Sequence, residues 1–464
     1  PELNMGSSDK SKQSNSGFSG QDARQNVFGR VNYDYAGKYL AEVTLRADGS
    51  SKFPKEKRFG FFPSASVGWR ISEESFMDNV DFIGNLKLRG SYGKMGNDAV
   101  SAFQYMMTYG FSNNYVIGNN DVSGLVQTNV PNPFITWETA ETWNAGFEAG
   151  LWNGLLDVEF DYFKSRRSDI LTKRNATVPD YTGLTLPDEN IGIVDNRGVE
   201  LVLSHANKIN EFSYQLSGNV SFARNKVVFA DEQPAAEPYQ YATGRPFGAA
   251  LLYKSLGVYR DQAQVDATPH LPGTKPGDLI YQDVNGDGEI DSRDRIRINQ
   301  TNIPEIVFGF TANFAYKGFD LALFFQGQEN AQQYFGGWFP VMSHTFGNFL
   351  DWRARDSWAV DNIDATMPRG STALWTTSTN SSYASTHWMK NAGFLRLKNL
   401  ELGYNLPAPI CKSFGAQGLR VSVSGSNLLI LYDHMKDMGF DPETHDFWYY
   451  PLQRVLNFGV NLTF

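Results

Sequence analysis

The chain has 464 residues, a formal net charge of −9 and a single cysteine, Cys411. This acidic balance, in which no Lys/Arg cluster stands out, argues against a nucleic-acid-binding protein, which needs a basic footprint. One cysteine excludes an intramolecular disulfide framework and a multi-cysteine zinc site. Aromatic residues make up 14% of the chain, although its mean hydropathy is negative. A membrane β-barrel would distribute so many rings over its lipid-facing band and interfacial girdles.

The first segment, PELNMGSSDKSKQSNSGFSGQ (1–21), is polar and loop-like. It has no charged n-region and no apolar h-region, so we do not interpret it as a signal peptide. We expect the chain to begin inside a larger protein. No apolar run in the sequence approaches the roughly 18 residues of a transmembrane helix.

Alternation of apolar and polar residues with a period of two is the dominant pattern, and it predicts β-strands. In FSYQLSGNVSF (212–222), every even position from Phe212 to Phe222 is apolar or Gly and every odd position is Ser, Gln or Asn. Roughly fourteen such segments have about the length that a tilted membrane strand needs. They lie near 27–35, 39–46, 62–71, 86–93, 103–109, 142–151, 155–163, 198–205, 212–223, 306–316, 319–326, 394–404, 419–428 and 454–464.

The connections between these segments are of two kinds. Tight turns are expected at 35–39, 152–156 and 316–320, whereas long polar loops occupy 47–61, 94–141, 164–197, 224–305 and 327–393. Alternation alone also fits a solvent-exposed antiparallel sheet, but short turns at one end and long loops at the other are typical of outer-membrane barrels. The terminal Phe464, on the apolar face of the last strand, is a further sign. The best helical candidate is 348–360, within a long loop.

One stretch, DVNGDGEIDSRD (283–294), has the spacing of a calcium-binding loop. The oxygen ligands would come from Asp283, Asn285, Asp287, Glu289 (through its backbone carbonyl), Asp291 and Asp294, and Ile290 would fix the loop to its surroundings. No helical pattern flanks the loop, so we expect a structural Ca²⁺ clip rather than a sensor. The alternative is an Asp/Gly-rich turn without an ion.

Several aromatic residues cluster in the predicted loops, and their rings could stack on sugar faces. The candidate substrate contacts are Trp338, Trp352, Trp358, Trp375 and Trp388. The alternative is that these rings pack the loops together, contact a partner or belong to an interfacial girdle. A basic stretch, RADGSSKFPKEKRFG (46–60), could contact lipopolysaccharide or substrate, or could be a solvated loop. We expect no enzyme, because the chain has no H-E-x-x-H, no G-x-S-x-G and no phosphate-binding glycine motif.

Many blocks of the chain resemble the C-terminal part of SusC/RagA-type TonB-dependent outer-membrane transporters. The most specific block is LRADGSSKFPKEKRFGFFPSASVGWRISEESFM (45–77). The others are LKLRGSYGKMGND (86–98), TWETAETWNAGFEAGLWNGLLDVEFDYFKSRRSDIL (136–171), NIGIVDNRGVEL (190–201), PGDLIYQDVNGDGEIDSRDR (276–295), IPEIVFGFTANFAYKGFDLALFFQG (303–327), FLRLKNLELGYNLP (394–407) and GFDPE (439–443).

This resemblance implies an all-β fold: a transmembrane antiparallel β-barrel of about 22 strands. The whole chain, 1–464, would supply roughly the last fourteen strands, with 276–295 as a calcium-loop-like segment in an extracellular loop. No plug and no TonB box are recognisable, so they are expected on another chain or segment.

The resemblance also implies a function, the active import of a glycan oligosaccharide or a peptide across the outer membrane of a Bacteroidetes-type bacterium. The implied partners are a SusD-like lipoprotein lid, TonB acting through the plug, outer-membrane lipid and lipopolysaccharide, and a second transporter–lid pair. The alternatives are a siderophore or cobalamin receptor, and a structural or adhesive surface barrel.

Overall fold

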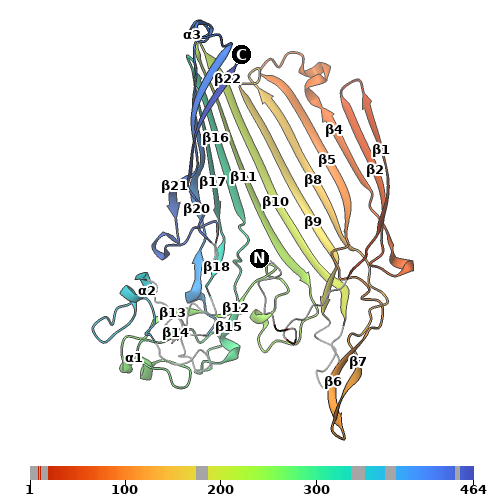
Figure 1. Cartoon of the computed structure of the whole chain (residues 1–464), viewed down its shortest axis with the longest axis vertical. Coiled ribbons are helices and arrows are strands. Elements are labelled where there is room, and N and C mark those ends of the chain that lie inside the picture. The colour runs from red at the N-terminus through yellow and green to blue at the C-terminus, as the bar shows by residue number, and fades with distance from the viewer. Residues whose placement is uncertain are drawn as a thin grey trace.

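The computed structural model describes residues 9, 11, 19–173, 187–335, 351–370, 383–444 and 450–464. One antiparallel sheet of 14 strands dominates it, and the strands follow one another in chain order (Figure 1). They are β1 (Arg24–Tyr35), β2 (Tyr39–Ser50), β4 (Ser64–Arg70), β5 (Ile83–Asn97), β8 (Glu138–Leu151), β9 (Leu156–Lys173), β10 (Asp188–Ile209), β11 (Phe212–Phe229), β16 (Ile306–Tyr316), β17 (Phe319–Glu329), β20 (Phe394–Asn405), β21 (Gly418–Asp433) and β22 (Val455–Thr463), with the short β3 (Phe59–Phe61) paired to β2.

The strands are joined by tight turns at one end of the sheet, as predicted for 35–39, 152–156 and 316–320. Lys317 and Gly318 both have positive φ, 45° and 87°. A two-residue hairpin of this kind matches the right-handed twist of the flanking strands, and glycine adopts it without steric cost. At the same end, β20 and β21 are connected through α3 (Ala408–Ser413), and Cys411 is buried there.

The opposite end of the sheet carries the long loops, which contain their own short elements. These are the two-stranded sheets β6 (Tyr109–Ile117) with β7 (Asn120–Gln127), β12 (Leu251–Tyr253) with β15 (Arg295–Arg297), β13 (Ser255–Val258) with β14 (Leu279–Tyr281) and β18 (Gln332–Tyr334) with β19 (Met389–Asn391), and the helices α1 (Gln262–Ala267) and α2 (Asp351–Asp356). Short 3₁₀ turns lie in these loops at Lys55–Lys57, Pro238–Gln240, Ser292–Asp294, Thr386–Trp388 and Lys436–Met438, whereas those at Ile71–Glu73 and Ser75–Met77 connect β4 to β5 at the tight-turn end. No helix among the described residues is long and apolar enough to cross a membrane.

The strand predicted at 103–109 is wrong. Phe103 has φ 62° and begins a turn, in which the amide of Met106 donates to the carbonyl of Phe103 at 2.9 Å. The strand in this region begins only at Tyr109, and it pairs with β7 rather than with the main sheet. A turn through Gly118 lets these two strands satisfy each other's backbone groups locally.

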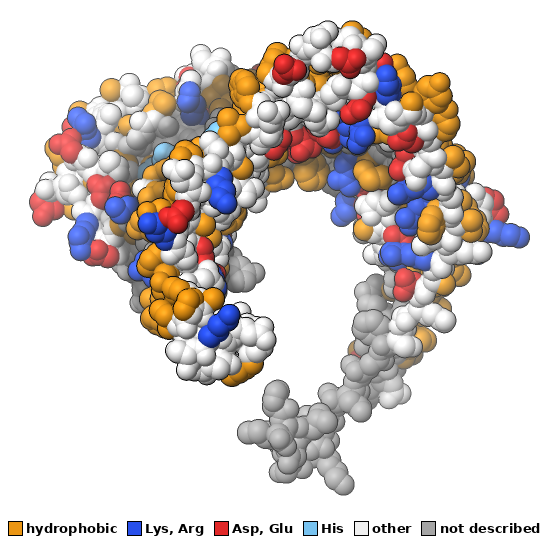
Figure 2. Space-filling model, turned by 90° about the horizontal axis from the view of Figure 1, so that it is seen from above, with side chains coloured by type: hydrophobic (Ala, Val, Ile, Leu, Met, Phe, Trp, Pro, Cys, Tyr) orange, Lys and Arg blue, Asp and Glu red, His pale blue; other side chains and the backbone are white. Residues whose placement is uncertain are grey.

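The pairing register sorts the side chains onto two faces, as the alternation predicted. Phe222, Val220 and Leu216 of β11 share one face with Phe308 and Ala312 of β16. The other face carries Ser, Asn, Gln and Thr. The apolar face lies on the convex side of the sheet, and charged side chains gather on its concave side (Figure 2). This separation is that of a barrel wall with lipid outside and water inside.

Among the described residues the sheet is open, because β1 and β22 each pair there with one neighbour only. The described strands therefore curve into a trough rather than a closed cylinder (Figure 2). Buried apolar clusters lie at the loop end: Phe53, Phe62, Ile135 and Trp137 form one, Tyr253, Leu279, Tyr281, Ile290 and Trp388 a second, and Ala331, Phe335, Ala392 and Met435 a third. The long loops are thus packed structures with cores of their own.

Candidate functional site: the inner wall and the loop cluster

The inner wall of the trough carries a polar groove of about 720 Å³ between β1 and β8. One row of register partners crosses five strands in this groove. It consists of Asn32 on β1, Glu42 on β2, Ser66 on β4, Ser91 on β5 and Asn144 on β8. Lys87 and Arg89 of β5 line the same groove. Such a surface is hydrated and offers both hydrogen-bond donors and acceptors.

The charges on this wall neutralise one another in a network that crosses three strands. The guanidinium of Arg89 contacts Glu159 and Asp161 of β9, and Nζ of Lys87 lies 3.3 Å from Oε1 of Glu148 on β8. Glu148 also lies 3.6 Å from Nε of Arg89. With two basic and three acidic members, the network has a net charge near −1, so its potential repels anions.

Gly146 of β8 leaves the space that this network needs. It is the register partner of both Arg89 and Asp161. A Cβ atom at this position would overlap Oδ1 of Asp161 and the carbonyl oxygen of Phe160. Glycine at position 146 therefore lets the Arg89–Asp161 pair lie flat against the wall.

The second half of the inner wall is lined by amide and hydroxyl groups. Its side chains include Gln215, Ser217, Asn219, Thr311, Asn313, Gln326, Ser422, Ser424, Asn457 and Asn461. Near the turn end, Nη2 of Arg420 lies 2.5 Å from Oδ2 of Asp320 and 2.6 Å from Oε1 of Glu401. This half again combines hydrogen-bonding capacity with internally paired charge.

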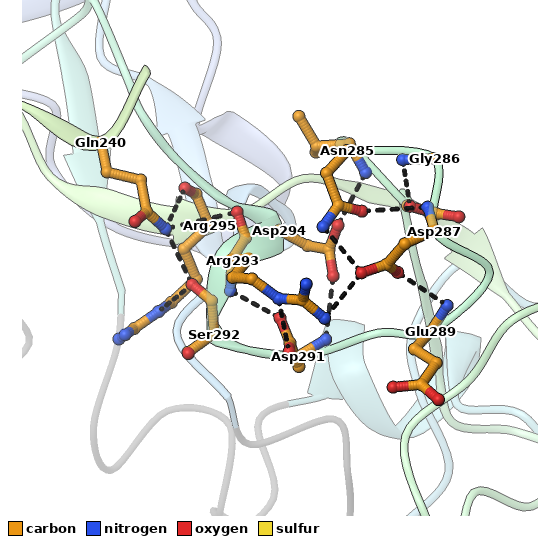
Figure 3. Close-up of polar contacts among 12 residues, drawn as sticks. Gln240, Asn285, Gly286, Asp287, Glu289, Asp291, Ser292, Arg293, Asp294 and Arg295 are labelled. Carbon is orange, nitrogen blue, oxygen red and sulfur yellow. Dashed lines mark hydrogen bonds and ion pairs between the residues drawn. The ribbon is translucent and has the colours of Figure 1, made fainter. Parts of the chain in front are cut away.

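The predicted calcium loop lies in the loop cluster and is tightly ordered by its own carboxylates (Figure 3). Asp283 accepts hydrogen bonds from the amides of Gly286 at 2.7 Å and Gly288 at 2.9 Å. Asp294 accepts from the amides of Val284 and Asp291, both at 2.8 Å. Ile290 is buried in the cluster of Trp388, as predicted for an anchoring residue. The side chain of Gln240 fixes the loop from outside by donating to the carbonyl oxygen of Ser292 at 2.8 Å.

The cationic partner within this loop is Arg293. Its guanidinium lies 2.6 Å from Oδ2 of Asp287 and 2.8 Å from Oδ2 of Asp291, two of the predicted ligands (Figure 3). The backbone amide of Arg293 also donates to Asp291, and this bond lowers the pKa of that carboxyl. Within the described part of the chain, no group of three or more acidic, His or Cys side chains is arranged to hold a metal. The oxygen donors suit Ca²⁺ in kind, but Arg293 competes for two of them.

The predicted aromatic contacts fall in different surroundings. Trp388 is 1% exposed and packs against Leu279 and Tyr281, so its position supports the packing alternative. Trp352 is half-buried against the cluster of Phe335 and Met435. Trp358 is partly exposed, and its indole N–H donates to the carbonyl oxygen of Arg260 at 3.1 Å. Trp338 and Trp375 lie outside the described residues.

Burial also changes the ionisation of groups around Trp388. Desolvation, with the cations of Lys390 and Arg353 nearby, lowers the pKa of His387 to about 3. Burial lowers the pKa of Arg353 to about 10 and raises the pKa of Tyr281. The guanidinium carbon of Arg353 lies 5.6 Å from the centre of the Trp388 ring. This part of the loop cluster is therefore a dry core rather than a solvated loop.

A buried ion pair at the rim of the wall was not predicted. Arg396 of β20 contacts Asp441 and Glu443, which belong to the GFDPE block, and this contact holds the 434–444 segment against the strand. Arg396 lies in the FLRLKNLELGYNLP block, and its two carboxylate partners lie in the GFDPE block; both blocks carry the family resemblance. The charged residues of those blocks were the signal that could have suggested the contact.

An antiparallel wall with an apolar outer face, a polar inner face, tight turns at one end and long loops at the other defines an outer-membrane β-barrel protein. The chain belongs to the family described as TonB dependent receptor-like, beta-barrel, which matches residues 3–274. Proteins of this family are transporters of the outer membrane rather than enzymes, which places the chain in that membrane.

Within this family, the chain is similar to transporters of the SusC/RagA type. The chain is 30% identical to TonB-dependent receptor P3 of Formosa agariphila, covering 94% of this chain and 45% of the relative. It is 28% identical to TonB-dependent receptor SusC of Bacteroides thetaiotaomicron, covering 94% and 43%. The solved structure of the RagAB peptide transporter shares the fold with a TM-score of 0.75 and 23% identity, covering 96% and 48%. The chain spans about half the length of these proteins.

Proposed function

We propose that the whole protein is an active importer of the SusC kind, in which this chain forms more than half of the barrel wall. The observation that carries the proposal is the inner wall: its charged side chains pair with one another across strands, and amide and hydroxyl side chains line much of the remaining surface. Such a wall would conduct a hydrated solute without holding it. The likeness to SusC over 94% of the chain supports the same function.

The cargo we propose is a hydrophilic oligomer, a glycan oligosaccharide in the first place and a peptide in the second. Hydroxyl and amide groups on the wall can exchange hydrogen bonds with either backbone. A peptide cargo is supported by the shared fold with RagAB, which is a peptide transporter. A metal chelate is less well supported, because the likeness to SusC extends over 94% of the chain. Trp338, Trp352, Trp358 and Trp375 remain our proposed sugar contacts.

The proposed partners follow from the open sheet and from the family. The free edges of β1 and β22 present unpaired backbone groups, and strands from the remaining part of the transporter would satisfy them. A plug from that same part would close the lumen and receive energy from TonB. A SusD-like lipoprotein would cover the loop end, and two such pairs would form a dimer.

Co-purification tests this proposal. The full-length protein is extracted from its native outer membrane with a mild detergent, and mass spectrometry identifies the proteins and the small molecules that accompany it. We expect a SusD-like lipoprotein, together with bound oligosaccharide or peptide. Recovery of the full-length protein without any lipoprotein and without cargo would favour a structural or adhesive barrel instead.

We also propose that the 283–294 loop holds a structural Ca²⁺ at the outer surface. The order of its oxygen donors, Asp283, Asn285, Asp287, Glu289, Asp291 and Asp294, supports this proposal. Binding would require the guanidinium of Arg293 to leave Asp287 and Asp291. The ion would then take over the role of that guanidinium and stabilise the contact between Ile290 and the loop core.

A further inference from the structure

The convex face of the sheet changes its chemistry stepwise toward the loop end. One cross-strand row contains Leu88, Phe147, Phe160, Leu201 and Val220. The second row beyond it, toward the loops, contains Tyr92, Trp143, Lys164, Arg197 and Arg224. The next row on the same face contains Lys94, Glu141, Arg166, Asp195 and Lys226. The apolar band therefore ends in two aromatic rings, and basic side chains follow directly beside and beyond them.

These basic side chains line a recess of about 620 Å³ on the sheet between β9 and the 244–246 segment. It is lined by Lys164, Arg197, Arg224, Lys226 and Arg245, and by only two acidic residues, Asp195 and Glu305. The basic side chains alternate in step with the apolar residues of their own strands. Lys164 lies on the same face of β9 as Phe160, Arg197 on the same face of β10 as Leu201, and Arg224 and Lys226 on the same face of β11 as Val220. The recess therefore opens on the convex face of the sheet rather than into the lumen.

Both acidic residues of the recess are already paired. Glu305 accepts two hydrogen bonds from Arg224, each 2.6 Å long, and Asp195 accepts two from Arg166, at 2.7 and 2.9 Å. Lys164, Arg197 and Lys226 are exposed and have no carboxylate partner within 4 Å among the described residues. The recess thus has three positive charges at its floor that form no ion pair among the described residues, and a fourth positive charge, Arg245, at its rim.

The height of the recess indicates what these charges face. Aromatic girdles mark the level of lipid headgroups, and Tyr92 packs on Trp143 here with their ring centres 4.5 Å apart. Long loops mark the extracellular side of such barrels, so this girdle belongs to the outer leaflet. Clusters of Lys and Arg beside a bilayer attract anionic headgroups. We propose that the recess binds the phosphorylated headgroup of an outer-leaflet glycolipid.

The proposal depends on the membrane placement of the chain and not on import. The recess lies on the lipid-facing side of the wall, whereas cargo would pass along the inner side. A bound glycolipid would link β9, β10, β11 and the 244–246 segment at the point where β11 extends beyond β16. It would therefore brace the base of the loop cluster from outside.

The test uses the purified full-length transporter and lipid A as the probe, with native mass spectrometry to measure retained lipid. The recess variant carries Lys164→Gln, Arg197→Gln and Lys226→Gln. The control carries Arg70→Gln, Lys208→Gln and Lys317→Gln at the turn end. Each basic group near a membrane surface is worth about fivefold in affinity, so we expect the recess variant to bind lipid A about a hundredfold more weakly. The control should bind it like the wild type, and lipid A without phosphates should bind weakly to all three proteins.

Three results would overturn the proposal. The first is equal retention of lipid A by the recess variant and the wild type. The second is equal binding of phosphorylated and dephosphorylated lipid A. The third is displacement of the lipid by an equal concentration of inorganic phosphate, which would indicate a site for a free anion. If the triple variant does not fold, the single change Lys226→Gln should still weaken binding about fivefold. Cargo uptake should be unchanged in either variant, so failure here leaves the import proposal standing.

Discussion

Arg396 on β20 is paired with Glu443, 47 residues further along the chain, with Nη1 2.6 Å from Oε1. Its second terminal nitrogen, Nη2, lies 2.7 Å from Oδ2 of Asp441, and the residue is 1% exposed. One guanidinium thus holds a loop segment onto the rim of the barrel wall. Glu443 also contacts Nζ of Lys398 at 2.5 Å, which closes a network of two cations and two carboxylates. This network connects the wall to the loop cluster that would face a partner outside the cell.

Replacement of Arg396 by Met should release the 434–444 segment. The change keeps much of the side-chain volume but leaves Asp441 without its cation, and breaking a buried pair costs about 3–5 kcal/mol. Limited proteolysis of the full-length protein in its native membrane measures the release as faster cleavage within 434–444. The matched control is Arg355→Met, because Arg355 pairs with Asp351 at a highly exposed site and such pairs contribute about 0–1 kcal/mol. Equal cleavage of Arg396→Met and wild type would contradict a clamping role.

Gly146→Ala should destabilise the wall, although alanine usually suits a strand better than glycine. The new methyl group would overlap Asp161 and the backbone of Phe160, and overpacking of this kind costs about 1–3 kcal/mol. The control is Gly93→Ala on β5, where the nearest atom would be Cβ of Ser64 at 3.5 Å. Thermal unfolding of the two variants compares them directly. A Gly146→Ala protein as stable as the control would show that the Arg89–Asp161 pair can rearrange freely.

Arg293→Gln should raise the affinity of the 283–294 loop for Ca²⁺. The guanidinium pairs with Asp287 and Asp291 and so competes with an incoming ion for their carboxylates. Its removal should strengthen binding up to about fivefold. Isothermal titration of the purified transporter measures this change. Asp283→Asn should weaken or abolish binding, since Asp283 fills the first ligand position. Absence of saturable binding in both wild type and Arg293→Gln would leave the loop as an Asp/Gly-rich turn held by arginine.

Acid should loosen the core around Trp388. In the folded protein, burial holds the pKa of His387 at about 3, below its ordinary value of 6.5. The unfolded segment takes up a proton below about pH 6.5, whereas the folded one does not until about pH 3. Stability is therefore lost progressively as the pH falls through this window, and is unaffected above it.

Hydrogen exchange of the 383–393 segment at pH 7 and pH 5 measures the effect. His387→Phe retains a ring beside Trp388 but cannot be protonated, so its protection should change less between these pH values than that of the wild type. His270→Phe, at an exposed position, should behave like the wild type. If wild type and His387→Phe lose protection equally, another group is responsible for the acid response.

The sequence predicts the wall better than the loops. Within the membrane band, each strand meets lipid on one side and water on the other, so residues such as Phe222 and Ser221 must alternate. Where β10 and β11 rise above the bilayer, both faces meet water and the alternation ends. The predicted strands 198–205 and 212–223 therefore fall short of the observed Asp188–Ile209 and Phe212–Phe229. The wrong strand at 103–109 has a different cause, because Phe103 takes a positive φ of 62° and begins a turn.

The sequence predicted which residue types form the candidate sites, but it did not predict which residues contact one another there. The spacing of the calcium loop indicated its oxygen donors, yet nothing local indicated that Arg293 would pair with Asp287 and Asp291. Trp388 stood out as a loop aromatic, but its burial depends on Leu279 and Tyr281, more than a hundred residues away. The basic recess is weakly indicated by the sequence, because Lys164 and Arg197 occupy positions in their strands where the alternation would place an apolar residue. Only the register places them side by side.

Uptake of labelled cargo tests the central claim most directly. Cells that carry the intact gene, a deletion, and the deletion complemented with the full-length gene are compared for accumulation of fluorescent oligosaccharides and peptides in the periplasm. We predict that the deletion abolishes uptake of at least one such oligomer and that complementation restores it. Unchanged uptake of every oligosaccharide and peptide in the deletion strain would contradict the account, and the polar inner wall would then have to serve a barrel without an import function.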